Sequence, residues 1–105
     1  MTYAEFWPTY LAAHADGRNR ALHFASTLGA LGIAGVAVLT GDWRWLIAAP
    51  IVGYGPAWFG HLVFEGNRPA SFAHPGWSLV SDFRMLALFL AGRLGGELRR
   101  TGLRK

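Results

Sequence analysis

The sequence predicts an all-α protein built on a membrane-spanning helical hairpin. Hydrophobic residues make up 52% of its 105 residues and charged residues only 15%, against about 25% charged in a typical soluble domain. So short a chain has too little interior to bury that much apolar surface. We therefore expect a single membrane domain over residues 1–105. Its spans lie at about 19–40 and 43–64, and they are flanked by helices at about 3–13 and 77–99.

The first of these helices is expected to lie at the membrane interface. Apolar and aromatic residues recur at three- and four-residue spacing through residues 3–13, which indicates an amphipathic helix. Thr2 and Glu5 have the spacing of a capping box, in which each side chain accepts from the backbone N–H of the other residue. About eleven residues are too few to cross a bilayer, so an interfacial position is favoured.

The two central stretches form the predicted hairpin. Residues 24–40 carry no charge, and as a helix they extend about 25 Å, enough to span. Residues 45–64 are also free of charge. The connection "GDWRW" (41–45) is so short that the two spans must be antiparallel. The start of the first span and the end of the second therefore lie at the same face of the membrane.

The last helix, at about 77–99, is either a tilted third span or a second interfacial helix. If it stays at the interface, nine of the ten Lys and Arg residues lie on one side and only Arg44 on the other. The positive-inside bias favours that arrangement, with the histidine face and both termini cytoplasmic, in a bacterial inner membrane. The basic C-terminal tail then fits anionic lipid better than nucleic acid. The small-residue faces of the spans also suit a homodimer.

All four histidines fall near one membrane face. His14 ends the first helix, His23 opens the first span, His61 closes the second span and His74 follows it. Small side chains continue the His23 and His61 faces in steps of three or four: Ser26, Ala30 and Ala34 on one span, and Ala57, Gly53 and Ala49 on the other. Since small residues let helices approach closely, packing of these faces brings His23 to His61 and Glu65.

Such a group suits a divalent transition metal. Two or more histidines with a carboxylate and open positions are typical of oxygen-using non-haem Fe(II) sites. Asn19 and Asn67 are placed to orient a ligand by a hydrogen bond, and Glu65 is either a fourth ligand or an ion-pair partner of Arg68. Alternatives stay open at this point: a non-catalytic scaffold, a lipid-binding or metal-binding subunit, and haem ligation by a histidine pair.

Several motifs resemble one family. The stretches "HADGRNRALH" (14–23) and "GHLVFEGNRPA" (60–70), flanked by "EFWPTYLAAH" and "SLVSDFRM", are similar to those of small membrane proteins related to 2-hydroxy fatty acid dioxygenase, in a compact bacterial-type form. The resemblance covers nearly the whole chain. It implies an Fe(II)-dependent enzyme that uses O2 to shorten a 2-hydroxy fatty acid by one carbon.

The resemblance also implies roles for particular residues. Fe(II) is expected on His14, His23 and His61, with Glu65 as a further catalytic residue. His74 has no dependable counterpart in the motifs and is expected at most to support a ligand. Arginine recognises carboxylates well, and three lie near the expected site: Arg18, Arg20 and Arg68.

Overall fold

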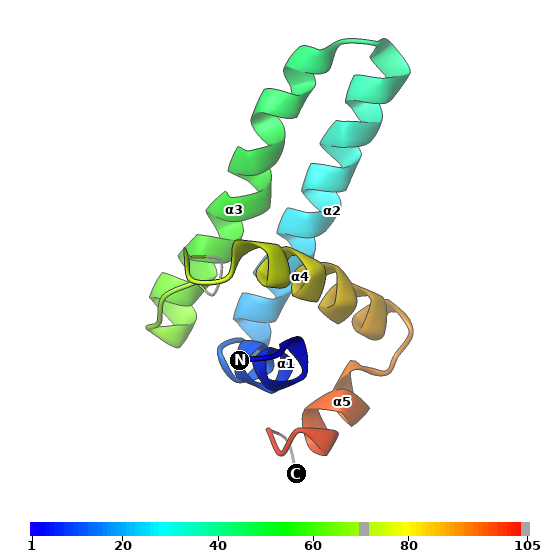
Figure 1. Ribbon diagram of the computed structural model, residues 1–105. Coiled ribbons are helices and arrows are strands. Elements are labelled where there is room, and N and C mark those ends of the chain that lie inside the picture. Colours follow the sequence, from blue (N-terminus) through cyan, green and yellow to red (C-terminus); the bar gives the residue numbers. More distant parts are fainter. Residues whose placement is uncertain (70–71, 104–105) are drawn as a thin grey trace.

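The computed structural model describes residues 1–69 and 72–103, which contain helices and no strand. The hairpin is made of α2 (Gly17–Thr40) and α3 (Ala48–Gly60). A 3₁₀ turn, η1 (Trp43–Ile47), precedes α3, and a π-helical turn, η2 (His61–Glu65), follows it. Three helices gather at the open end of the hairpin (Figure 1): α1 (Tyr3–Ala12), α4 (Pro75–Leu90) and α5 (Leu94–Arg100). The predicted fold class is confirmed.

The hydrophobic core lies at this wide end rather than inside the hairpin. Helix α1 begins with the predicted capping box, in which Glu5 N donates to Thr2 Oγ1 and Thr2 N donates to Glu5 Oε1. Its inner face then packs against α4 and α5, through buried Phe6, Trp7, Tyr10 and Leu11 on one side and Met85, Leu86, Leu94 and Leu98 on the other. Apolar burial of this kind is the main force that docks these helices.

Small residues bring α2 and α3 together, as the sequence predicts. A Cβ atom added at Gly53 would lie 3.6 Å from the Ala30 Cβ, which is ordinary contact. At Gly60 the approach is much closer, because a Cβ there would lie 2.2 Å from Asn19 Oδ1. Only glycine leaves room for the buried Asn19 side chain at the end of the hairpin where the histidines lie.

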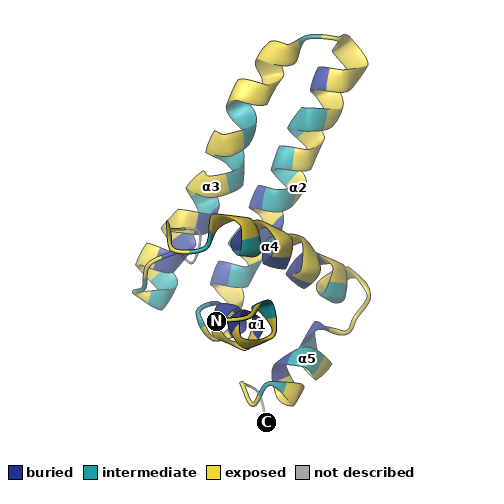
Figure 2. Ribbon diagram, in the orientation of Figure 1, coloured by how far each residue is buried: buried dark blue, intermediate teal, exposed yellow. Residues whose placement is uncertain are grey.

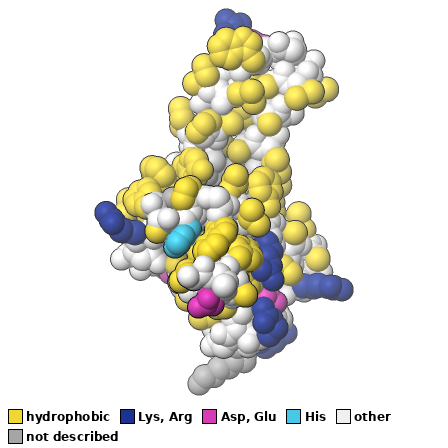
Figure 3. Space-filling view, viewed as in Figure 1, with side chains coloured by type: hydrophobic (Ala, Val, Ile, Leu, Met, Phe, Trp, Pro, Cys, Tyr) yellow, Lys and Arg dark blue, Asp and Glu magenta, His cyan; other side chains and the backbone are white. Residues whose placement is uncertain are grey.

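The outer surface of the hairpin is apolar and uncovered. Val38 and Leu39 are 81% and 87% exposed. Figure 2 shows that most residues of the hairpin are exposed, and Figure 3 shows hydrophobic side chains over its length. Gly17–Thr40 and Trp43–Glu65 are each long and apolar enough to cross a membrane, yet only 17% of the apolar window in each is buried. A core helix of a soluble protein would be mostly buried, so the exposure favours a lipid-facing hairpin.

The C-terminal helix expected at 77–99 is divided in two. Gly92 adopts a left-handed conformation with φ of 71°. Its N–H donates to Phe89 O, and the N–H of Arg93 donates to Leu88 O at 2.8 Å. This is the Schellman pattern that ends a helix at glycine. Helix α4 is therefore about 24 Å long and runs across the hairpin (Figure 1). The last two basic residues, Arg104 and Lys105, lie outside the described residues.

Replacing Gly60 by alanine should destabilise the protein. The new methyl group meets Asn19 Oδ1 in a packed helix contact, and overpacking of this kind costs about 1–3 kcal/mol. Thermal unfolding of purified Gly60→Ala in detergent should show a lower midpoint than the wild type. Gly55→Ala is the matched control, because a Cβ there meets no atom within 4 Å. Equal midpoints for the two variants would contradict the close approach.

Candidate metal centre

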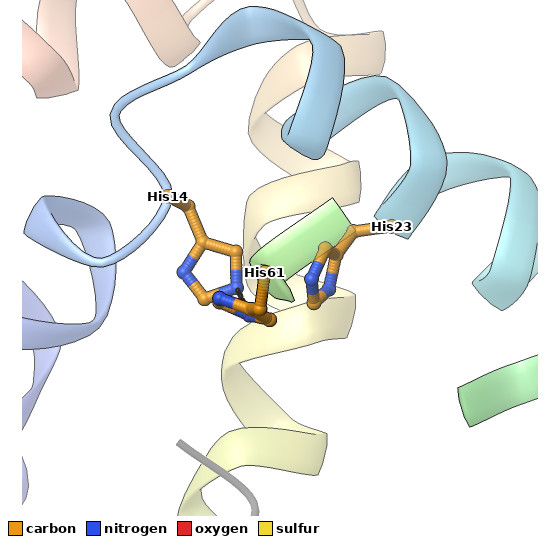
Figure 4. A group of neighbouring side chains, drawn as sticks. All are labelled: His14, His23 and His61. Atoms are coloured by element: carbon orange, nitrogen blue, oxygen red, sulfur yellow. Dashed lines mark hydrogen bonds between the residues drawn. The ribbon is translucent and has the colours of Figure 1, made fainter. Parts of the chain in front are cut away.

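Three of the four histidines meet in the buried region where the hairpin joins α1 and α4. His14 follows α1, His23 lies in the second turn of α2, and His61 is the first residue of η2. They are 0%, 6% and 1% exposed, respectively. One ring nitrogen from each lies within 4.8 Å of the other two, and Figure 4 shows the three rings turned toward a common centre. The packing of α2 on α3 and the turn after α1 therefore bring them together as expected.

Each imidazole is held at its Nδ1 by an oxygen atom. The pairs are His14 with the backbone oxygen of Tyr10 at 2.6 Å, His61 with Asn67 Oδ1 at 2.7 Å, and His23 with Asp82 Oδ1 at 3.3 Å. Carbonyl and carboxylate oxygens accept but do not donate. The Nδ1 atom of each ring therefore carries the proton, and each Nε2 presents a lone pair.

The orientation of the Asn67 amide supports this assignment. Its Nδ2 donates to the backbone oxygen of Ala13 at 3.1 Å, so its Oδ1 is the atom that faces His61. One side chain thus fixes the His61 ring and ties it to the chain beside His14. These contacts are compatible with the ligand-orienting role predicted for Asn67, which stays a prediction.

The Nε2 atoms of His14 and His61 face each other at 3.0 Å. The His23 Nε2 is buried and has no hydrogen-bond partner among the described residues. Two lone pairs at that distance repel unless a cation lies between them. Two nitrogens each about 2.1 Å from one ion and at a right angle lie about 3.0 Å apart. The three residues therefore fit a divalent metal ion.

A shared proton is a poorer way to remove this repulsion. It would place a positive charge on a ring that is shielded from water. Burial above all, and then the neighbouring His23, holds the pKa of His14 well below its ordinary value. His14 is therefore neutral at neutral pH, which is the form that binds metals.

A small cavity lies against the three rings. Its volume is about 10 Å³, which is room for roughly one water-sized sphere. Tyr54 and Trp58 line it from α3, and Ser78 from α4. The Ser78 hydroxyl is buried and has no hydrogen-bond partner in the part of the chain that the structure describes. Three nitrogen ligands leave coordination positions open, as catalytic metal sites do, and the aromatic wall limits access of bulk water.

Asp82 is the site residue that sequence reasoning missed. Its Oδ1 accepts from His23 Nδ1 and also from the hydroxyl of Tyr10, whose ring stacks on His14 with 4.1 Å between centroids. A carboxylate on the far nitrogen of a metal-binding histidine orients the ring and raises its basicity. The available signal was the single acidic side chain in residues 77–90.

Glu65 and Asn19 support the loop that carries His14. Glu65 Oε1 accepts from the Asp16 N–H at 2.6 Å and from Asn19 Nδ2 at 3.4 Å. The group of possible metal ligands within the described residues does not include Glu65. No ion pair between Glu65 and Arg68 is found in that part of the chain. A direct catalytic role for Glu65 stays a prediction.

The arginines expected to attract a carboxylate make other contacts, and none lines the cavity. Arg18 pairs with Asp16 at 2.7 Å, Arg20 Nη1 donates to the backbone oxygens of His14 and Ala15, and Arg68 lies 5.9 Å from the centre of the Phe72 ring. Arg20 thus closes the end of the α1 turn. Recognition of a substrate carboxylate by these residues stays a prediction.

His74 lies outside the group. Its ring stacks on Trp77 with 5.2 Å between centroids and meets Phe6 edge-on at 5.3 Å. These contacts belong to the core between α1 and the start of α4. His74 is therefore a natural control for the three clustered histidines.

The fold and the site define a class: a small all-helical protein with an exposed apolar hairpin and a buried three-histidine centre suited to a transition metal. The family model described as "2-hydroxy-palmitic acid dioxygenase Mpo1-like" matches residues 1–94, so the chain belongs to the Mpo1-like family. This confirms the resemblance found in the sequence. Comparison with curated proteins and with solved structures gave no match in either case.

Removal of any one of the clustered imidazoles should weaken metal binding. We expect His14→Ala, His23→Ala and His61→Ala, purified without oxygen and dialysed against Fe(II), to retain much less iron than the wild type. His74→Ala should retain the wild-type amount, because its ring contacts Trp77 and Phe6 instead. Metal analysis of the four variants checks this, and equal retention by all four would argue against the centre.

Loss of the Asp82 carboxylate should weaken the centre without removing a ligand. Asp82→Asn cannot hold the His23 ring as strongly, and loss of such a partner typically costs about 10–100-fold in metal affinity. Titration with Co(II), followed by its visible absorption, measures the change. Asp42→Asn is the control, since Asp42 pairs with Arg44 at the turn of the hairpin. Unchanged affinity in Asp82→Asn would show that the contact does not orient the ring.

Proposed function

We propose that this protein is an Fe(II)-dependent membrane dioxygenase that shortens a 2-hydroxy fatty acid by one carbon. One observation carries the proposal: three buried imidazoles, each hydrogen-bonded at Nδ1, bring one ring nitrogen apiece within 4.8 Å of the others beside a small cavity. The family description adds the class of reaction and of substrate.

Iron suits this donor set. Imidazole nitrogens bind iron well, and histidine sites with open positions are typical of non-haem Fe(II) oxygenases. His14, His23 and His61 would hold the ion. Iron bound there supplies the Lewis acidity and the redox chemistry that a reaction with O2 requires.

The other residues of the site prepare the ligands and exclude water. The backbone oxygen of Tyr10, Asn67 Oδ1 and Asp82 Oδ1 keep the three Nδ1 protons in place, so that no ring must change tautomer to bind metal. Tyr54 and Trp58 form an aromatic wall, and Trp58 is braced edge-on by Phe72 at 5.0 Å. A water-poor site strengthens each of these electrostatic interactions.

The overall reaction balances with O2 as the only oxidant. The bond between C1 and C2 of the 2-hydroxy acid breaks, and C2 becomes the carboxyl carbon of the shortened acid. C1 leaves as CO2. The one oxygen atom that is then left over leaves as water, together with the two hydrogen atoms that neither the shortened acid nor CO2 contains. No further reductant is consumed, so the products should form in a fixed ratio to O2.

The proposed location is a membrane that the hairpin spans. Both termini and the histidines lie at the end of the hairpin away from the η1 turn (Figure 1). In the view of Figure 3 the basic side chains gather at that end, with a separate one at the turn. The positive-inside bias favours that end on the cytoplasmic side, which in a bacterium is the inner face of the inner membrane.

The test is O2 consumption by the Fe(II)-loaded protein with 2-hydroxypalmitate. We expect one pentadecanoate for each O2 consumed, and none from palmitate, which lacks the 2-hydroxyl group. His61→Ala should lose the reaction and His74→Ala should keep it. Iron bound by the wild type with no product from any 2-hydroxy acid would overturn the proposal and leave a metal-binding membrane subunit.

A further inference from the structure

An apolar groove continues from the metal centre along the hairpin. It has a volume of about 320 Å³ and runs between α2, α3 and α4. Tyr54 and Asp82 line both this groove and the small cavity beside the histidines. The groove and the cavity therefore meet at these two side chains, and the far end of the groove lies at Leu46, next to the turn of the hairpin.

The groove is lined to hold hydrocarbon. Asp82 is the only charged residue along it and lies at the end nearest the histidines. The floor is made of small residues from both spans, Ala30, Ala49 and Gly53, and Leu79 and Phe83 of α4 form the wall over part of it. Small residues facing large apolar ones leave a channel between them rather than a filled helix contact.

The groove is long enough to hold most of a single acyl chain. Eight residues separate Leu46 from Tyr54, and a helix of that length rises about 12 Å. The hydrocarbon of one leaflet is about 15 Å deep, so the groove covers most of a lipid tail. A helix from a partner protein is about 10–12 Å across and is too thick for a channel of this volume.

We propose that this groove binds the acyl chain of the substrate acid and sets the chain lengths that the protein accepts. The inference rests on the proposed function for the identity of the acid. The reacting end of the acid lies at the junction of groove and cavity, beside Tyr54 and Asp82, and the methyl end points toward Leu46. The groove meets the small cavity beside the histidines at that junction, as a chain attached to a reacting carboxyl end requires.

Binding is measured under anaerobic conditions, so that no turnover occurs. The protein in lipid nanodiscs is photolabelled with 2-hydroxypalmitate that carries a diazirine at its methyl end. We expect labels near Leu46 and Pro50. Unlabelled 2-hydroxypalmitate should compete, and phospholipid should not. Labels confined to the outer faces of the hairpin, or equal competition by phospholipid, would overturn the inference.

The effect of a substitution in the groove floor on acid binding should depend on its distance from the histidines. Ala49→Leu obstructs the far half, so affinity for 2-hydroxypalmitate should fall at least tenfold while that for 2-hydroxyoctanoate stays unchanged. Gly53→Leu obstructs the near half and should weaken both acids. Gly55→Leu is the matched control on the same helix, because a Cβ there meets no atom within 4 Å. Retained Co(II) binding shows that each variant is folded.

The two proposals fail in different ways. If binding depends on the position of the substitution but no O2 is consumed, the groove proposal is supported and the dioxygenase proposal is contradicted. O2 consumption with the same chain-length preference in Ala49→Leu and the wild type would keep the function and overturn the groove.

Discussion

The structure depends on the hydrogen bonds that fix three buried imidazoles in one tautomer. An imidazole that is buried with neither nitrogen satisfied is costly. Here each Nδ1 is satisfied by an oxygen, and the cost is concentrated on the Nε2 atoms that face one another. His14 and His61 place theirs 3.0 Å apart. A cation between the two nitrogens would offset the repulsion, so a metal ion bound there would also stabilise the fold locally.

The loop between α1 and α2 shows how much of the chain serves this arrangement. His14 lies on a turn whose backbone groups are bound by side chains from elsewhere. Asn67 donates to the carbonyl of Ala13, Arg20 donates to the carbonyls that follow it, and Glu65 accepts from the Asp16 N–H. None of these three side chains belongs to the histidine group, yet together they fix the position of His14 relative to His61. In this structure these side chains support the backbone that carries His14.

Local patterns in the sequence were enough to predict the hairpin and the histidine group. The small-residue faces of residues 26–34 and 49–57 specify how the spans pack, and the hairpin then determines that His23 and His61 meet. The role of Asp82 could not be predicted in this way, because it depends on the angle at which α4 crosses the hairpin. No periodicity within α4 encodes that angle, which is set by packing against α1 and α2.

Two further features also could not be predicted from local sequence patterns. Gly92 followed by Arg93 is compatible with a helix end, but the apolar stripe continues past it and favoured one long helix. Only the backbone of the structure shows the left-handed conformation at Gly92. Glu65 is one helical turn from His61, and this spacing suggested a shared ligand role. Its actual partners, Asp16 and Asn19, lie on another helix and its cap, where sequence spacing carries no information.

The position of the centre explains why so small a protein can be built this way. A hydrophobic acid in a bilayer keeps its carboxyl end at the interface and its chain in the hydrocarbon. The hairpin is arranged in the same way, with the histidines at one end and an apolar surface along the rest of α2 and α3. In the proposed location a membrane covers the outer surface of the hairpin, so the chain needs a folded core only around α1, α4 and α5. The histidines lie where that core meets the apolar hairpin, so the two ends of the proposed substrate would reach surroundings that suit them without a larger enclosing domain.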